Sequence, residues 1–108
     1  MTLCIQRDTF LCMIEVRQSA IFVKWYASLK DIRARARIDI RIRRLSLGNP
    51  GDVKAVGKGI SELRVDVGKG YRIYFVQRAE QLIILLAGGH KGTQQKDIEK
   101  AKQIADEI

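Results

Sequence analysis

The fold is decided by the stretch from residue 60 to residue 91, which contains Ile60-Ser-Glu-Leu-Arg-Val-Asp-Val-Gly-Lys-Gly-Tyr-Arg-Ile-Tyr-Phe75 and Leu82-Ile-Ile-Leu-Leu-Ala-Gly-Gly-His-Lys91. Two strands, at about 60–67 and 71–78, are predicted on either side of Gly68-Lys69-Gly70, because glycines favour a short hairpin turn. The unbroken apolar run over 82–87 is typical of a strand buried on both faces. The stretch therefore predicts a hairpin followed by an interior strand.

Upstream of the hairpin the sequence predicts one more strand and two helices. Alternation of apolar and polar residues over 13–18 indicates an opening strand, and Ser19 is placed to cap a helix that runs to residue 29. Asp31 can cap a second helix. Residues 32–45 alternate with period two, but Ala and Arg are strong helix formers, the segment is too long for an ordinary strand, and Gly48 supplies a stop. We therefore predict a helix there.

The second helix carries two apolar stripes on nearly opposite sides, Ala34, Ile38, Ile42 and Leu45 on one and Ile32, Ala36, Ile40 and Leu47 on the other. Either both stripes are buried by the rest of the domain, or one packs inward and the other is left for a partner. Residues 48–59 are predicted as a glycine-rich loop. A polar C-terminal helix is expected over 94–108, with an inner face formed by Ile98, Ala101, Ile104 and Ala105.

Length and composition indicate one small domain. With 108 residues the chain can build a single modest core. Residues 1–12 show no period, so we expect them to form an N-terminal extension outside the core and the domain to span residues 13–108. Charged residues interrupt any signal peptide, no apolar run could cross a membrane, and Cys4 and Cys12 are interpreted as free thiols. The expected location is the cytoplasm.

The formal net charge is +8, and it is concentrated in the first half of the chain. Between Arg17 and Arg44 nine Lys or Arg residues face two Asp residues, which leaves +7 in that segment. A polyanionic partner such as RNA is plausible on this charge, although an Ala/Arg-rich helix is often only a solvated surface.

The polar face of the hairpin carries the candidate chemistry. With Val67 opposite Tyr71, we expect Asp66 to lie opposite Arg72 and Arg64 to lie opposite Tyr74. The strand over 82–87 then ends beside this face, so that its last residues could bring further groups to it, namely His90 and Lys91. Guanidinium groups stabilise the charge of a pentavalent phosphorane, and a near-neutral group moves protons. The simpler interpretations are a solvated face with one ion pair and a structural histidine.

No spacing of His, Cys, Asp and Glu predicts a metal site, no Walker-type loop is present, and one histidine supports no nucleophile triad. No cofactor is expected. A nuclease built on this face would use the RNA 2′-hydroxyl as its nucleophile without a metal ion.

Five motifs together resemble a known family, the addiction-module killer proteins of the RelE/ParE superfamily in their HigB-like branch. They are Trp25-x-x-x-Leu29-Lys30-Asp31, Gly48-Asn49-x-Gly51-Asp52-x-Lys54, Ile60-x-Glu62-Leu63-Arg64, Gly70-Tyr71-Arg72-Ile73-Tyr74 and Gly88-Gly89-x-Lys91-x-Thr93-Gln94-x-x-Asp97-Ile98. The resemblance covers residue 13 to the C-terminus. It implies an α+β fold with two N-terminal helices packed on a twisted, mainly antiparallel sheet of about four strands.

The resemblance implies a type II toxin that cleaves messenger RNA on the ribosome and is held inactive by an antitoxin, expected to be a small helix-turn-helix protein. Arg72 corresponds to the transition-state arginine, with Arg64 and Lys91 as supporting cations. His90 and Glu62 are the candidate bases. Predicted substrate contacts are Tyr74, Lys54, Lys58, Arg37 and Arg41.

This sequence departs from the family pattern at two places, which limits how far the family's residue roles apply to it. Residues 91–97 hold no counterpart of the C-terminal tyrosine that some RelE members use, and His90 stands where many relatives in this branch carry Asp. The alternative function is that of a ParE-like toxin, which binds DNA gyrase without cleaving RNA, and a third is a decayed toxin that still binds its antitoxin. The sequence leaves open whether the chain forms a homo-oligomer.

Overall fold

A computed structural model describes residues 14–108. The predicted extension over residues 1–12, with both cysteines, lies outside the described residues, so the division into an extension and a domain stays a prediction. The elements are β1 Glu15–Gln18, α1 Ala20–Ser28, α2 Ile32–Ser46, β2 Val53–Gly57, β3 Ile60–Val65, β4 Tyr71–Ala79, β5 Leu82–His90, the 3-10 turn η1 Lys91–Thr93 and α3 Gln94–Glu107. The predicted α+β class, with two N-terminal helices and a C-terminal helix, is confirmed.

The strands form one mixed sheet in the order β1-β5-β4-β3-β2. Neighbouring strands are antiparallel except β1, which runs parallel to β5 with Glu15 opposite Leu82. Strand β5 lies between β1 and β4, and its apolar residues contribute to the cores on both faces of the sheet, as the unbroken run predicted. The sheet is mainly antiparallel, as expected, and has one strand more than the sequence indicated.

The additional strand is β2, and the prediction of a loop over residues 53–57 is wrong. Val53 pairs with Leu63 and Ala55 pairs with Ser61 of β3. All residues of β2 are exposed except the half-buried Val56, so the sequence shows no apolar alternation there. An exposed edge strand that carries a lysine is a common way to discourage pairing with other chains.

Both N-terminal helices begin where the sequence places their caps. Ser19 Oγ accepts the N–H of Phe22 at 3.0 Å at the start of α1. Asp31 Oδ1 accepts the N–H groups of Arg33 at 3.0 Å and Ala34 at 3.3 Å at the start of α2. The helix over 32–46 is confirmed, so helix propensity and capping outweigh the period-two pattern of its side chains.

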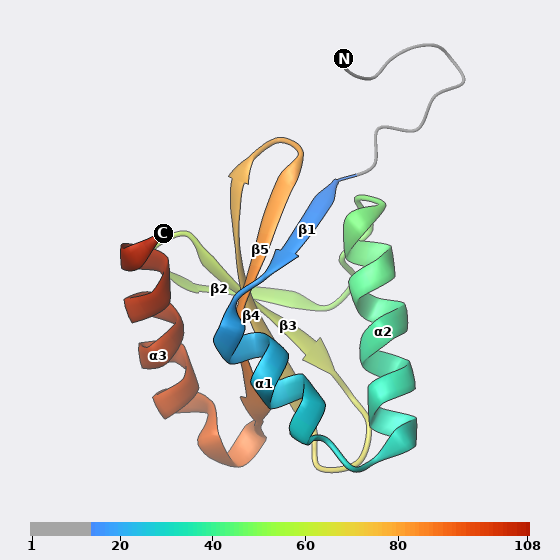
Figure 1. The fold of residues 1–108 in the computed structure, drawn as a ribbon. Helices are drawn as coiled ribbons and strands as arrows, with labels where there is room; N and C mark the ends of the chain where they lie inside the picture. Colours follow the sequence, from blue (N-terminus) through green and yellow to red (C-terminus); the bar gives the residue numbers. More distant parts are fainter. Residues whose placement is uncertain (1–13) are drawn as a thin grey trace, which may run out of the picture.

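Helices cover both faces of the sheet. On one face Phe22 of α1 and Ile38 of α2 pack against apolar side chains of β3, β4 and β5. On the other face Ala101 and Ile104 of α3 pack on Tyr74 and its neighbours, which confirms the predicted inner side of this helix. In Figure 1 α1 lies between α2 on the right and α3 on the left, with the strands crossing behind it.

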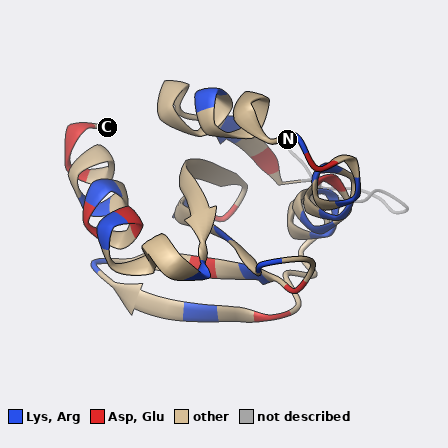
Figure 2. Cartoon of the chain, turned by 90° about the horizontal axis from the view of Figure 1, so that it is seen from below, with Lys and Arg blue, Asp and Glu red and all other residues tan. Residues whose placement is uncertain are grey.

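One stripe of α2 is buried and the other is not. Ala34 and Ile38 are fully buried against the sheet, whereas Ile32 is 81% exposed, Ile40 48% and Leu47 50%. The alternative that both stripes are buried within the domain is therefore wrong. Lys and Arg residues are frequent along α2, as the blue segments of Figure 2 show. Within residues 14–108 no helix combines the length and the apolar character that a membrane span requires.

Candidate functional site

The strand register gathers charged and polar side chains of β2, β3 and β4 on the α3-facing side of the sheet. Arg64 of β3 lies opposite Arg72 of β4, and Glu62 lies opposite Tyr74. Lys54 of β2 lies opposite Glu62 and so shares its face. Two arginines, a lysine, a carboxylate and a phenol therefore come together.

This register differs by two residues from the predicted one, and the expected Asp66–Arg72 pair is wrong. Strands β3 and β4 are joined by residues 66–70, because Val67 N–H bonds to Val65 O and Gly70 N–H bonds to Val67 O, both at 3.0 Å. These local bonds take Asp66 and Val67 out of the ladder. Side chains alternate with period two, so a shift of two residues leaves every residue on its predicted face.

Glu62 is the centre of the site. Its side chain is fully buried, and its Oε1 accepts from Arg72 Nη1 at 3.1 Å and Arg64 Nε at 3.2 Å. Its Oε2 accepts from Gln94 Nε2 at 2.7 Å and Tyr74 Oη at 3.1 Å. One buried carboxylate thus holds donors from β3, β4 and α3.

The balance of burial and hydrogen bonding keeps Glu62 ionised. Burial by itself raises the pKa of a carboxyl group, but the hydrogen bonds from Arg64, Gln94 and Tyr74 and the charge of Arg72 more than offset it, so that the pKa of Glu62 is lowered. Burial, followed by the charge and hydrogen bond of Glu62, raises the pKa of the Tyr74 phenol well above its ordinary value. Tyr74 therefore stays protonated and donates a hydrogen bond to the carboxylate.

These contacts bear on two of the predicted roles, which stay predictions. Glu62 has each oxygen engaged by two donors and no solvent-exposed surface, so in this geometry it anchors the arginines and offers no free oxygen to a base reaction. Tyr74 is likewise fully buried and has no exposed surface for the predicted contact with substrate. Both side chains support the site from beneath.

Both arginine side chains remain partly exposed to solvent. The side chain of Arg64 is 35% exposed and that of Arg72 is 14% exposed, while one nitrogen of each is held by Glu62. A guanidinium has five N–H donors, so further donors remain to meet an anion that approaches from solvent. The exposed Lys54 adds charge on the same face.

His90 does not join this cluster, and the expectation that it would is wrong. It lies opposite Tyr71, whose side chain packs in the core beneath α1 and α2, on the other face of the sheet. Its Nδ1 accepts the N–H of Gly92 at 3.0 Å and caps η1. Lys91, the next residue, is exposed, and its backbone N–H donates to Gly70 O at 2.9 Å. It lies at the border of the two faces, and its role as a supporting cation stays a prediction.

Another predicted substrate contact, Lys58, is also separated from the arginines. Lys58 lies in the β2–β3 turn and pairs with Asp106 near the C-terminal end of α3 at 3.9 Å. Gln94, at the start of that helix, is twelve residues from Asp106, a rise of about 18 Å at 1.5 Å per residue. Lys58 therefore lies far from the carboxylate cluster.

The two predicted contacts on α2 differ from each other. Arg41 is a structural residue, because its guanidinium donates to the carbonyl oxygens of Arg64, Pro50 at 2.9 Å and Asp52 at 3.5 Å. It ties α2 to the loop before β2 and to β3. Arg37 is exposed and borders a cavity of about 530 Å³ beside α2. Its contact with substrate stays a prediction.

Sequence reasoning missed Gln94 as a member of the site. The only sequence signal was its place in the Thr93-Gln94 part of the last motif, directly after the strand that ends beside the arginines. Two glycines bring α1 and α3 onto that strand end. A Cβ on Gly88 would lie 2.2 Å from Trp25 Cε3, and one on Gly89 would lie 1.8 Å from Asp97 Oδ2. A side chain at either position would clash with its neighbour, which explains why both positions are glycine.

Among residues 14–108 no group of three or more His, Cys, Asp and Glu side chains is arranged to hold a metal ion. The fold and the site thus define a small basic α+β domain that presents two arginines, anchored by a buried carboxylate, on one face of a mixed sheet. Residues 24–108 match the model of a family described as "Phage derived protein Gp49-like (DUF891)", and the chain belongs to this family.

A relative in Haemophilus influenzae is 48% identical over 95 residues, an alignment that covers 88% of this chain and 96% of that protein. That relative is itself described as uncharacterized.

Proposed function

We propose that this chain is the toxin of a type II toxin–antitoxin system and that it cleaves messenger RNA on the ribosome without a metal ion. The observation that carries the proposal is the pair of arginines fixed by the buried Glu62. Membership of the Gp49-like family supports a toxin–antitoxin role, and the five motifs shared with RelE-like proteins support the activity.

The arginines suit a phosphate that gains negative charge in the transition state. In the proposed reaction the 2′-oxygen of the RNA attacks phosphorus, the bond to the 5′-oxygen breaks, and a proton passes from the 2′-hydroxyl to that leaving oxygen. The products are a 2′,3′-cyclic phosphate and a 5′-hydroxyl. Arg72 and Arg64 stabilise the extra charge of the phosphorane, because their donors are oriented before the substrate arrives.

Glu62 and Gln94 act in this proposal as positioning residues. The carboxylate prevents the arginine side chains from turning into solvent, and it removes only one of the two positive charges. Lys54 and Lys91 add long-range attraction for the RNA backbone.

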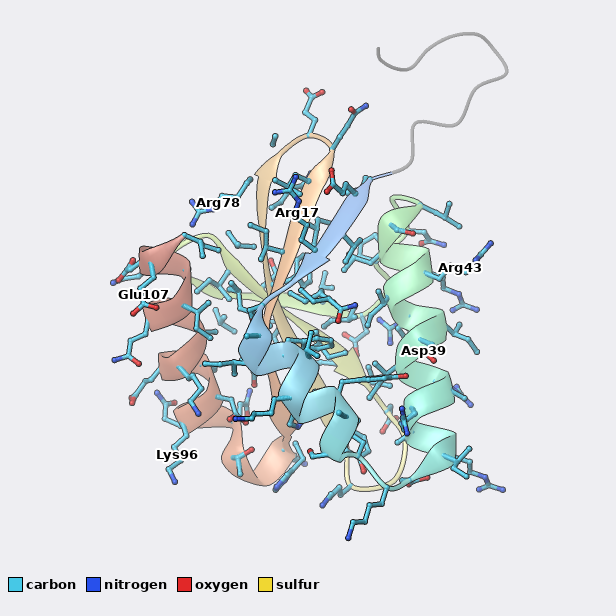
Figure 3. All side chains as sticks on the ribbon, viewed as in Figure 1. Arg17, Asp39, Arg43, Arg78, Lys96 and Glu107 are labelled. Atoms are coloured by element: carbon cyan, nitrogen blue, oxygen red, sulfur yellow. The ribbon has the colours of Figure 1, made fainter. Side chains whose placement is uncertain are left out.

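Ribosome binding is assigned to the outer side of α2. Its exposed arginines face solvent beside the uncovered stripe of Ile32, Ile40 and Leu47. Figure 3 shows one of them, Arg43, pointing away from the sheet. Attraction of this kind should weaken steeply as salt rises.

The test is to induce the chain in bacterial cells, with and without its neighbouring gene, and to map the 5′ ends of messenger RNA. We expect growth arrest, new RNA ends and relief of arrest by the neighbouring gene. Arg72→Ala should remove the new ends. Arg17→Ala is the matched control, because Arg17 is exposed on β1 at the opposite end of the sheet (Figure 3) and, among residues 14–108, its side chain pairs with Glu15 alone.

Three results would contradict the proposal in different ways. Arrest with unchanged RNA ends would instead favour a ParE-like action on gyrase. Arrest that survives Arg72→Ala would refute the assigned site, and the absence of arrest on induction would refute a toxin function altogether.

A further inference from the structure

A second cavity lies on the opposite face of the sheet from the arginines. It measures about 400 Å³ and opens where the α1–α2 connection, the loop from 66 to 70 and the end of β5 meet. Figure 1 shows that connection beside the yellow loop at the lower end of β3. The lining residues are Trp25, Ser28, Leu29, Lys30, Asp31, Lys69, Tyr71 and His90. This volume lies within the range of cavities that hold small organic ligands.

Trp25 gives the cavity a rigid aromatic wall. Its six-membered ring lies against the backbone of Gly88, so closely that a Cβ there would be only 2.2 Å away. Tyr71 meets the indole edge to face, with ring centroids 6.4 Å apart. A half-buried indole that is held in place on one side is a suitable platform for stacking a flat ligand on the other.

The rim of the cavity is positive. Lys30 and Lys69 are exposed on two different loops, and Asp31 is the one carboxylate among the lining residues. The Asp31 carboxylate is already committed to capping α2. His90 accepts a hydrogen bond at Nδ1, so its neutral ring carries the hydrogen on Nε2 and can donate it to a ligand acceptor.

We propose that this cavity binds a nucleobase together with the phosphate next to it, the base stacking on Trp25 and the phosphate lying between Lys30 and Lys69. The assignment of the nucleobase to an RNA strand rests on the proposed function; a free mononucleotide offers the same chemistry. The combination of one aromatic wall and cationic side chains is the recurring pattern of single-strand recognition.

The two sites are neighbours around the end of the sheet. Gly89 pairs with Arg72, and the next residue, His90, pairs with Tyr71. Consecutive strand residues face opposite sides, so one step along β5 leads from the arginine site to the cavity. An RNA strand that crosses this end can place its scissile phosphate at Arg72 and insert a neighbouring base beside Trp25.

The chain supplies its own reporter, because Trp25 is its single tryptophan. Trp25 fluorescence is titrated with adenosine 5′-monophosphate, with ribose 5-phosphate and with a single-stranded RNA of about eight nucleotides. Stacking of a base should quench the indole, so we expect saturable quenching by the mononucleotide and the RNA but not by the sugar phosphate. The RNA should bind at least tenfold more tightly than the mononucleotide.

Variants of the rim test the phosphate contacts without removing the reporter. Lys30→Ala and Lys69→Ala should each weaken mononucleotide binding about fivefold, the effect of one exposed ionic contact of up to 1 kcal/mol. Lys102→Ala is the matched control and should change nothing, because Lys102 lies on α3 beside Gly57, at the other end of that helix from the arginine site.

Several outcomes would overturn the proposal: no quenching by the mononucleotide, equal quenching by ribose 5-phosphate, or equal affinity for the Lys30, Lys69 and Lys102 variants. Equal affinity for RNA and mononucleotide would overturn RNA as the source of the base. If induced cells show no RNA cleavage while the titrations succeed, the proposed function fails and the nucleotide site stands.

Discussion

Replacing the buried carboxylate by an amide, Glu62→Gln, tests the core of the site. The amide keeps the size of the side chain but offers one acceptor oxygen to four donors and turns its own N–H groups toward the others. The bond from Arg64 contributes less than about 1 kcal/mol, because this side chain is 35% exposed and screened by solvent. Loss of the charge-assisted bond from Arg72 and weakening of the bonds from Tyr74 and Gln94 bring the expected destabilisation to about 3 kcal/mol.

The destabilisation caused by Glu62→Gln should decrease as the pH falls. The pKa of Glu62 in the folded protein lies below its ordinary value of 4.5, so the unfolded chain binds the proton more readily. The stabilisation is therefore complete above about pH 4.5 and is lost as the pH falls through the folded pKa. The difference between the two proteins should be large at pH 7 and should shrink as the pH drops below 4.

Urea unfolding followed by circular dichroism at pH 7 and at pH 3.5 measures the loss of stability and its dependence on pH. In a thermal scan at pH 7 the midpoint should fall by about 12–24 °C, since about 1 kcal/mol corresponds to 4–8 °C in a domain of this size. Glu80→Gln, in the exposed β4–β5 turn, controls for loss of a negative charge. A difference below about 0.5 kcal/mol, or one that is the same at both pH values, would refute the account of Glu62 as an ionised anchor.

Three further predictions follow from single contacts. Gly88→Ala should destabilise the fold by about 2–3 kcal/mol and shift the emission of Trp25, because the new methyl group overlaps the indole; unchanged emission and stability would contradict the packing. Asp31→Ala should cost about 1 kcal/mol in urea unfolding by removing the cap of α2, and an unchanged midpoint would show that the cap is dispensable. The hydrogen bond to Asp39 at 2.6 Å, with burial, raises the pKa of Tyr26, so Asp39→Asn should lower that pKa in an ultraviolet titration; a higher or unchanged pKa would refute this.

The sequence predicted the two faces of the hairpin correctly, although it missed the register. Alternation defines which residues share a face, and an error of two positions leaves that property unchanged. The register itself depends on the bond from Val67 N–H to Val65 O, which leaves no trace in the pattern of residue types. The ion pair expected for Asp66 was lost in this way, and the role of Glu62 became visible only in the structure.

Other errors have different physical causes. Strand β2 has almost no buried residues, so hydrophobic periodicity could not reveal it. His90 was expected beside the arginines because it follows the interior strand, but the face it occupies is set by its pairing with Tyr71, and that requires the register of β4 and β5. The contact of Gln94 with Glu62 depends on where α3 begins relative to the sheet, which no local pattern encodes.

The parallel pairing of β1 with β5 has a consequence for how the chain reaches its native state. Strands β2 to β5 form a meander of near neighbours, whereas Ser19 Oγ bonds to Leu86 O across 67 residues of sequence. Closing so long a loop is entropically unfavourable and slow. During synthesis β1 leaves the ribosome early but has no partner strand until β5 has emerged, so we expect the meander to assemble first and β1 with α1 to dock in a late step.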